Sequence, residues 1–497
     1  MDSLFQSTGA DRIKKPFYIL VILFVAFAGA YAIAVKGIVI GAVLIALPLI
    51  VYIVIRVFIN PKLGLIICFG FSFFAIGLTR YVAGVPFGLA VDGLLGMSLI
   101  ALILSLGKKV EWKRAKHDIT ALSAVWMGYT VLEIANPLAI SAEAWFYAMR
   151  GVAFYQILMI PLGFLLIREV KDLKLFIWIW LIISVLAAFK GIQQINIGTD
   201  PWETAWLDGG GELTHRIQGR LRAFSFYSDA GQFGAAMGHA SLVAGIIALG
   251  PGTRFKKILF GFISFVTLMG MLYSGTRGAL FVPAPGVMLY LFLSKNFKVF
   301  ALGLVGALAV FGVLRFTFIG NNNYQIYRIR TAVQPSQDRS YQVRLENQRR
   351  LKVFMKDKPF GGGIGTAGNW GMRFSPNTFL AQTPTDSWYV RIWAEMGILG
   401  LALHLFILFW ILIHCAIIAW KLKDPELRQI INALVAGIFG IMVASYGNGL
   451  YGQMPTNLVI YMSYIFVYIS PLLDKQLAAE PNRKWDILFN GIKFKRY

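Results

Sequence analysis

The chain has 497 residues, of which 57% are hydrophobic and 14% are charged, whereas a soluble domain carries roughly 25% charged residues. This composition excludes an ordinary soluble protein and predicts an all-α polytopic integral membrane protein. The net charge is +23, but cytoplasmic loops of membrane proteins are normally basic, so the sign alone does not predict a nucleic acid partner, and none is expected. Cys68 and Cys415 each lie inside an apolar run, which argues against a disulfide framework or a cysteine metal site. We expect no cofactor and no metal.

Apolar runs of about 15 to 25 residues, long enough to cross a hydrocarbon core of roughly 30 Å, recur along the whole chain. Residues 1–16 are mostly polar and offer no small-residue cleavage site, so the first run is expected to be a retained span. We predict about fourteen transmembrane helices. They lie at 17–35, 38–55, 63–79, 86–106, 119–134, 152–167, 173–188, 233–249, 258–273, 279–293, 299–318, 393–420, 430–446 and 457–473.

The distribution of Lys and Arg sets the expected orientation, because cytoplasmic loops are enriched in these residues. With the N-terminus inside, the short basic loops all face the cytoplasm; they lie at 108–116, 168–174, 253–257, 294–298 and 421–428. The predicted organisation follows from that placement. It has transmembrane helices within 1–318, including an outer arginine loop at 193–231, then a large outer loop at 319–392, further transmembrane helices within 393–474 and a basic cytoplasmic tail at 475–497.

The two long outward loops break the charge rule that the rest of the chain obeys. Residues 319–390 hold ten Lys or Arg against four Asp or Glu, and the loop at 193–231 adds Arg216, Arg220 and Arg222. One explanation is contact with anionic lipid headgroups. The other is an anionic substrate at the outer surface, because a guanidinium offers fixed, bidentate donors to phosphate. A membrane protein would meet such a phosphate on a lipid-linked pyrophosphate.

Arg344 is the first candidate for a pyrophosphate ligand. In a helix that starts near Tyr341, Arg344, Gln348 and Leu351 fall on one face, so Arg344 can turn inward while Arg349, Lys352 and Lys356 lie elsewhere. Arg222 is the second candidate, since a polar turn, SFYSDAG, follows it before the next span. The alternative for either arginine is a lipid-facing or salt-bridged side chain.

Glycines, aromatic residues and intramembrane polar residues complete the candidates. The run GGGIGTAG at 361–368 has no Walker lysine after it, so it predicts a tight turn, with its amides near a sugar or phosphate, or a helix break. Aromatic side chains in and after this loop could stack on sugar rings or anchor the chain at the membrane interface; they are Trp370, Trp388, Tyr389 and Trp393. Polar residues within apolar runs are functional candidates because burial is costly; they are Asp92, Glu133, His239, His404 and His414.

Four motifs resemble those of the O-antigen ligase and O-antigen polymerase superfamily, in the expected order. They are RLRAFSFYSDAGQFGAA at 220–236, SGTRGAL at 274–280, RLENQRRLKVFMKDKPFGGGIG at 344–365 and DSWYVRIWAEMGILG at 386–400. The resemblance covers about 220–400, whereas residues 1–190 match only in being helical spans. It implies a GT-C-like membrane glycosyltransferase, multi-pass in the bacterial inner membrane, with both termini in the cytoplasm.

One departure from the family pattern shifts the expected reaction. Ligases of this superfamily look for a histidine where this chain has Asp386. The resemblance therefore favours a polymerase of O-antigen, capsule or exopolysaccharide, which transfers a growing glycan from undecaprenyl pyrophosphate onto a lipid-linked repeat unit, without a metal. A ligase that transfers polysaccharide to lipid A core or another acceptor remains open. From another class, so does a flippase or exporter of lipid-linked oligosaccharide. The implied partners are the lipid-linked oligosaccharide, membrane lipids, a chain-length regulator and a flippase.

The predicted site combines the chemistry of these residues with the family motifs. Arg222, Arg344 and Asp386 are the expected catalytic residues, with the two arginines on the pyrophosphate. Asp386 could accept the proton of the acceptor hydroxyl, position the loop by pairing with Arg344 or Arg391, or cap the helix that follows. The expected substrate-binding residues are Arg220, Arg277, Arg349, Trp388, Tyr389 and Arg391.

Overall fold

The computed structural model describes residues 38–479 with gaps at 83, 105–109, 218, 296 and 320–338, of which 327 and 330 are described. It also describes 486–489 and scattered residues between 16 and 34. The expected first span at 17–35 lies largely outside the described residues, as do parts of the large loop and most of the tail.

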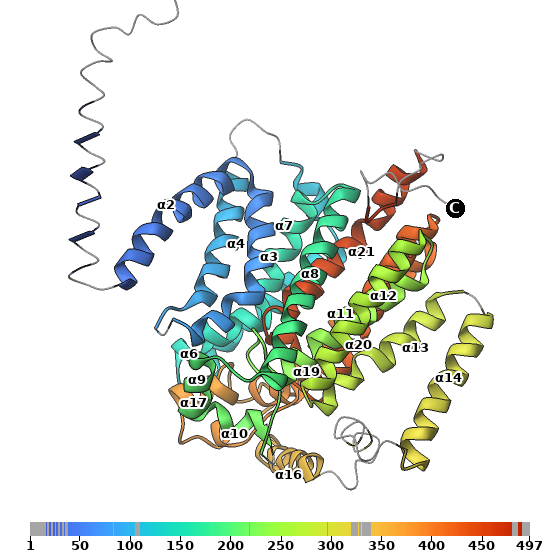
Figure 1. The fold of residues 1–497 in the computed structure, drawn as a ribbon. Helices are drawn as coiled ribbons and strands as arrows, with labels where there is room; N and C mark the ends of the chain where they lie inside the picture. Colours follow the sequence, from blue (N-terminus) through green and yellow to red (C-terminus); the bar gives the residue numbers. More distant parts are fainter. Residues whose placement is uncertain are drawn as a thin grey trace, which may run out of the picture.

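The described chain is nearly all helical, which confirms the predicted fold class (Figure 1). A two-residue antiparallel hairpin, in which Arg216 pairs with Leu221, is the sheet that the described residues form. The elements up to that hairpin are α2 (Ile38–Ile59), α3 (Pro61–Ala75), α4 (Phe87–Ile103), α5 (Asp118–Leu132), α6 (Ala142–Met149), α7 (Tyr155–Leu166), α8 (Val170–Asn196), α9 (Pro201–Trp206), α10 (Glu212–His215), β1 (Arg216–Ile217) and β2 (Arg220–Leu221). After it come α11 (Ala230–Leu249), α12 (Arg254–Tyr273), α13 (Pro283–Leu293), α14 (Phe297–Phe316), α16 (Arg339–Phe354), α17 (Gly368–Phe374), α18 (Phe379–Gln382), α19 (Trp388–Lys421), α20 (Pro425–Ala444) and α21 (Thr456–Ala478).

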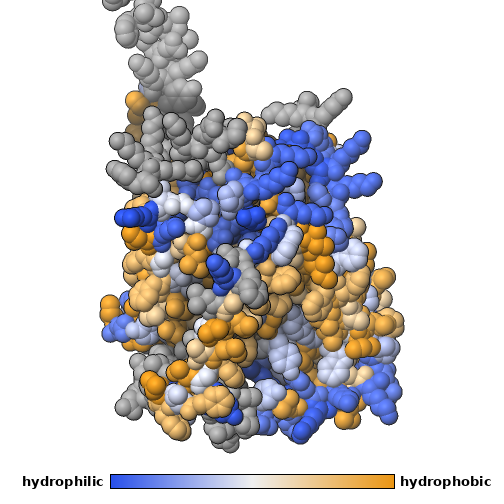
Figure 2. Space-filling model, turned by 90° about the vertical axis from the view of Figure 1, so that its right-hand side faces the viewer, coloured by the Kyte–Doolittle hydropathy of each residue, from blue (hydrophilic) through white to orange (hydrophobic). Residues whose placement is uncertain are grey.

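Seven helices within the described residues are long and apolar enough to cross a membrane. They are Ala142–Leu166, in which α6 and α7 run together, and α8, α11, α12, α19, α20 and α21. Shorter apolar helices, such as α3 and α4, overlap other predicted spans. The protein is therefore a polytopic membrane protein, although these criteria do not confirm the expected count of about fourteen. Figure 2 shows apolar residues gathered across the middle of one face, with hydrophilic residues more frequent toward its two ends.

Three helices, α11, α20 and α21, form the centre of the bundle. Each is buried over 78% or more of its apolar window, whereas the corresponding share is 28% in α19. Small residues explain the close packing of α11, because it reads AGQFGAAMGHASLVAGIIAL and small side chains allow helices to approach closely. A Cβ at Gly238 would lie 2.9 Å from the Met271 sulfur of α12. These central helices fix the positions of the loops at their ends.

The segments that carry the candidate residues lie at one end of the bundle, here called the loop end. It comprises α9, α10, the hairpin and α16 to α18 (Figure 1). The starts of α8 and α12 and the described part of the tail lie at the opposite end. The large loop and the arginine loop therefore share one end of the molecule.

The tail contains a buried segment that the sequence analysis did not anticipate. Asp486 accepts a hydrogen bond from Lys256 at 2.9 Å, and Lys256 also contacts Glu426 at 2.6 Å. Leu488 is fully buried, and its carbonyl oxygen accepts a hydrogen bond from the Trp178 indole. Within the expected basic tail, residues 486–489 are therefore docked against the bundle.

Candidate functional site at the loop end

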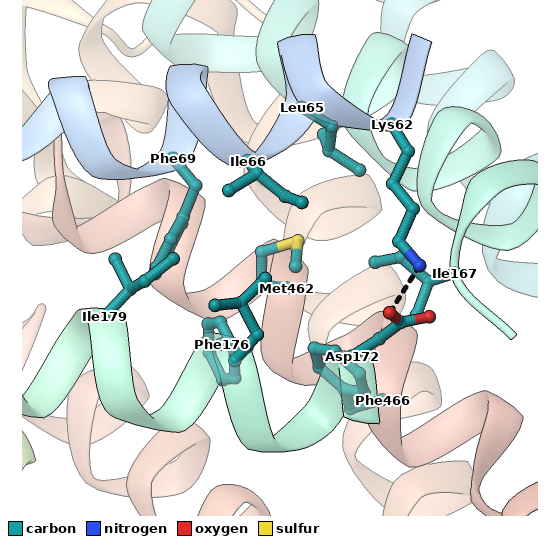
Figure 3. A pocket seen from close by; sticks show the side chains of 11 residues that line it. Lys62, Leu65, Ile66, Phe69, Ile167, Asp172, Phe176, Ile179, Met462 and Phe466 are labelled. Carbon is teal, nitrogen blue, oxygen red and sulfur yellow. Dashed lines mark hydrogen bonds and ion pairs between the residues drawn. The ribbon is translucent and has the colours of Figure 1, made fainter. Parts of the chain in front are cut away.

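The pocket in Figure 3 does not have the chemistry of the expected anion site. It is lined almost entirely by apolar side chains of α3, α8 and α21, such as Phe69 and Met462. Lys62, the cation that lines it, is already paired with Asp172 (Figure 3). Both residues lie near the starts of their helices, at the end opposite to α9. The candidate site must be built from the loop-end residues instead.

Arg222 joins two of the predicted motifs. It follows β2, and its guanidinium donates to the Thr214 carbonyl at 3.1 Å, the Ser274 carbonyl at 3.2 Å and the Thr276 hydroxyl at 2.6 Å. Thr276 directly precedes Arg277, the first residue of a short 3₁₀ helix. The structure therefore brings the motifs at 220–236 and 274–280 together, with the Arg222 guanidinium fixed between them.

Arg80, which the sequence analysis did not select, holds the turn after Arg222. It donates to the carbonyl oxygens of Ser225 at 2.7 Å, Tyr227 and Ser228. Its guanidinium also lies over the ring of Phe224, 4.5 Å from the centroid, in a cation–π contact. Burial lowers the pKa of Arg80 to about 10, so the side chain remains charged at neutral pH. The sequence signal that could have identified Arg80 is its position as the one charged residue in the turn TRYVAGVP at 79–86.

Arg344 and Asp386 form an ion pair, with Nε 3.0 Å from Oδ2. The side chains are 34% and 50% exposed, so both remain accessible to a ligand. On α16, Leu351 is buried and Arg344 partly buried, whereas Lys352 is exposed. The predicted inward face of this helix is therefore confirmed.

The interpretation of Asp386 as a helix cap is wrong. The N-cap of α19 is Ser387, whose side chain accepts a hydrogen bond from the Val390 amide. Serine satisfies the exposed amides of the first turn as well as aspartate would, which leaves Asp386 outside the helix. Of the three roles weighed for Asp386, pairing with Arg344 matches the observed contact.

The glycine-rich segment packs against a kink in α19. Its Gly362 and Gly363 amides form hydrogen bonds within the protein and are therefore not free to bind a ligand. Gly362 donates to the Ala394 carbonyl at 2.9 Å and Gly363 donates to the Glu395 carbonyl at 2.8 Å. At the kink, Gly397 has φ 69° and ψ −171°, a conformation that is essentially restricted to glycine. The glycines therefore let two backbones meet.

Buried Glu395 strengthens this junction. Its side chain is completely buried; Oε1 accepts a hydrogen bond from the Ala367 amide at 3.3 Å and pairs with Arg391 Nε at 3.2 Å. Glu395 therefore links the glycine-rich segment to the first turns of α19. It also draws Arg391 toward the protein, whereas the sequence suggested Arg391 as a substrate ligand.

The other expected substrate-binding residues differ in their exposure to solvent. Trp388 is 1% exposed and donates to His404 Nε2 at 2.9 Å, so its ring packs inside the protein. The Tyr389 hydroxyl donates to the Met442 carbonyl at 2.7 Å. Arg220 on β2 and Arg349 on α16 are exposed, and Arg349 lies near Glu346. The exposed arginines can reach a ligand, whereas Trp388 is part of the core.

The polar residues expected within the membrane contact other polar side chains or aromatic rings. Asp92 pairs with Arg150 at 2.7 Å. The His239 ring packs edge-on against Trp180, and His404 accepts the Trp388 indole hydrogen bond. Glu133 and His414 contact Asn136 and Asp118, respectively. The contacts of Asp92, His239 and His414 join different helices, whereas those of Glu133 and His404 lie within one turn and within α19, respectively.

Together these features define a polytopic membrane protein whose candidate site consists of arginine-rich segments at one end of its helical bundle. A model of the family described as "O-Antigen ligase" matches residues 262–405, from α12 through the large loop into α19. The chain is also 29% identical over 196 residues to an "O-antigen polymerase" of Salmonella muenchen, a match that covers 39% of this chain and 47% of that relative. The chain thus spans about half the length of the curated relative it matches. Both matches support the O-antigen ligase and polymerase superfamily that the four motifs predicted.

Proposed function

We propose that this protein is a polysaccharide polymerase of the bacterial inner membrane. The loop end faces outward, and the enzyme transfers a growing glycan from undecaprenyl pyrophosphate onto a lipid-linked repeat unit, without a metal. The observation that carries the proposal is the Arg344–Asp386 pair. It combines a planar cation with a carboxylate on accessible loop residues, in two segments that resemble the family motifs.

The proposed reaction is a displacement at the anomeric carbon of the donor sugar. A hydroxyl of the acceptor sugar forms the new glycosidic bond while the bond to the pyrophosphate breaks. Negative charge then grows on the departing phosphate oxygens, where Arg344 and Arg222 stabilise it through charge-assisted hydrogen bonds. The proton of the hydroxyl leaves to Asp386 or to the departing phosphate. The ion pair favours a positioning role for Asp386, because one carboxylate oxygen already accepts from Arg344.

A ligase is the second candidate, favoured by the description of the family model that matches 262–405. Both reactions use the same donor, so the arginines would serve either one. They differ in the acceptor, which is a lipid-linked repeat unit for the polymerase and lipid A core for the ligase. A flippase is the candidate of another class, and it would move the lipid-linked oligosaccharide without changing it.

One reconstitution experiment separates the three functions. The purified full-length protein is placed in liposomes with lipid-linked oligosaccharide and lipid A core, and the products are separated by gel electrophoresis. We expect a ladder of longer lipid-linked glycans. Glycan found on lipid A core would replace the proposal with the ligase, and translocation of unchanged substrate would replace it with the flippase.

A further inference from the structure

An aromatic cluster at the loop end includes Trp370, which the sequence suggested for sugar stacking or membrane anchoring, and two rings that the sequence did not suggest. It joins Tyr147 of α6 to Trp370 and Phe374 of α17, and is called here the aromatic platform. The centroid of the Tyr147 ring lies 4.9 Å from that of the Trp370 ring and 5.9 Å from that of the Phe374 ring. The corresponding interplanar angles are 17° and 15°. Trp370 and Phe374 are inclined by 26° to each other. The three rings therefore share nearly one orientation.

A cation accompanies the rings. Arg373 is exposed, and its guanidinium carbon lies 5.2 Å from the Phe374 ring centre and 5.6 Å from the Tyr147 ring centre. Each of the three rings is partly exposed, so the cluster packs against the protein and can still contact a ligand. Flat, partly exposed rings beside a donor-rich cation combine an apolar surface with a hydrogen-bonding group.

The platform is tied to the proposed reaction site through the backbone. The amides of Gly362 and Gly363 donate hydrogen bonds to the carbonyl oxygens of residues 394 and 395 in α19. The amide of Ala367, the residue before α17, donates to the Glu395 side chain. A Cβ at Gly371 would overlap the Thr366 carbonyl, so the entry into α17 is tightly packed. The platform and the first turns of α19, which follow Asp386, are therefore parts of one rigid frame, as a binding site requires.

We propose that the aromatic platform binds the sugar part of the lipid-linked substrate, an inference that rests on the proposed function. The C–H face of a sugar ring carries partial positive charge and stacks on the negative face of an aromatic ring. Arg373 donates to sugar hydroxyls or to an acidic substituent of the glycan. The platform therefore holds the glycan while the arginines described above hold the pyrophosphate.

Membrane-interface anchoring is the competing role for these rings, since Trp and Tyr are common at that depth. An anchor needs lipid contact alone, so it predicts no affinity for free sugar. The probe is thus the lipid-free oligosaccharide pool released by mild acid from the lipid-linked intermediates of the producing cell. Its binding to the full-length protein in nanodiscs is measured by saturation-transfer NMR.

We expect Trp370→Ala to weaken oligosaccharide binding roughly tenfold, the loss of one stacking contact. Trp370→Phe should restore much of the binding, because it keeps a flat ring. Met372→Ala is the matched control, since Met372 is exposed on the same helix and lies outside the cluster. Arg373→Gln, at an exposed position, should also weaken oligosaccharide binding. It provides a second test of the platform if Trp370→Ala does not fold.

The outcomes separate this inference from the proposed function. If the wild-type protein, Trp370→Ala and Arg373→Gln all bind the oligosaccharide equally well, the proposed role of the platform is overturned. This holds even if the protein forms glycan ladders. The absence of sugar binding to wild-type protein would overturn it as well. If binding depends on Trp370 but the reconstituted protein forms no ladder, the platform stands and the polymerase proposal fails.

Discussion

Replacing Arg344 with lysine should reduce polymer formation almost as strongly as replacing it with alanine. Lysine keeps the positive charge but loses the planar fork that binds two phosphate oxygens at once. Removing one donor that stabilises developing negative charge typically lowers kcat by about 100-fold or more. The rate of ladder formation by reconstituted protein, at matched protein levels, measures the effect.

Two companion variants separate this effect from general charge loss. Lys352→Ala removes an exposed cation from the same helix and should leave the rate nearly unchanged. Asp386→Asn keeps the shape of the side chain, and Ser387 still caps α19. It should lower the rate because the ion pair with Arg344 is lost. Full polymer length from Arg344→Lys would instead favour a lipid headgroup as the ligand of Arg344.

Gly397→Ala should separate the large loop from α19 and abolish activity. The new methyl group would overlap the Pro359 carbonyl oxygen, and the backbone conformation at φ 69° disfavours any side chain. Strain of this kind costs about 1–3 kcal/mol before the overlap is counted. Limited proteolysis should then cut 359–386 faster than in wild-type protein, while membrane insertion of the bundle is retained.

Gly128→Ala provides the matched control for this change. Gly128 lies within α5, and a Cβ there would meet nothing within 4 Å. Alanine is the better helix former, so this variant should keep its activity and its protease resistance. Normal activity in Gly397→Ala would show that the junction between the glycine-rich segment and α19 is dispensable.

Hydropathy predicted the helices well because a membrane span must satisfy its backbone hydrogen bonds within itself. The helical period likewise placed Arg344 and Leu351 on the less exposed face of α16. The pattern could not fix the number of crossings, since α3 and α5 have 15 residues each. Nor could it detect the docked segment at 486–489, whose contact with Lys256 is a long-range one.

Local patterns in the sequence selected residues of the candidate site, but they did not reveal its long-range contacts. The motifs identified Arg222, Arg344 and Asp386, and the structure pairs the last two. The clamp of Arg80 on Ser225 joins residues 145 apart in sequence, which no local pattern reveals. Local pattern also cannot tell an aromatic residue that faces the core from one at a surface, which is why Trp388 was expected at the sugar.

Impermeant thiol labelling in intact cells tests most directly the claim that the loop end faces outward. Both native cysteines are buried, so single cysteines can be introduced at two exposed positions, Asn369→Cys at the loop end and Glu111→Cys in a basic loop. With the outer membrane permeable to the reagent, we expect labelling of the Asn369→Cys protein and none of the Glu111→Cys protein until the cells are lysed. The reverse pattern would contradict the proposed site, because the arginines would then face the cytoplasm.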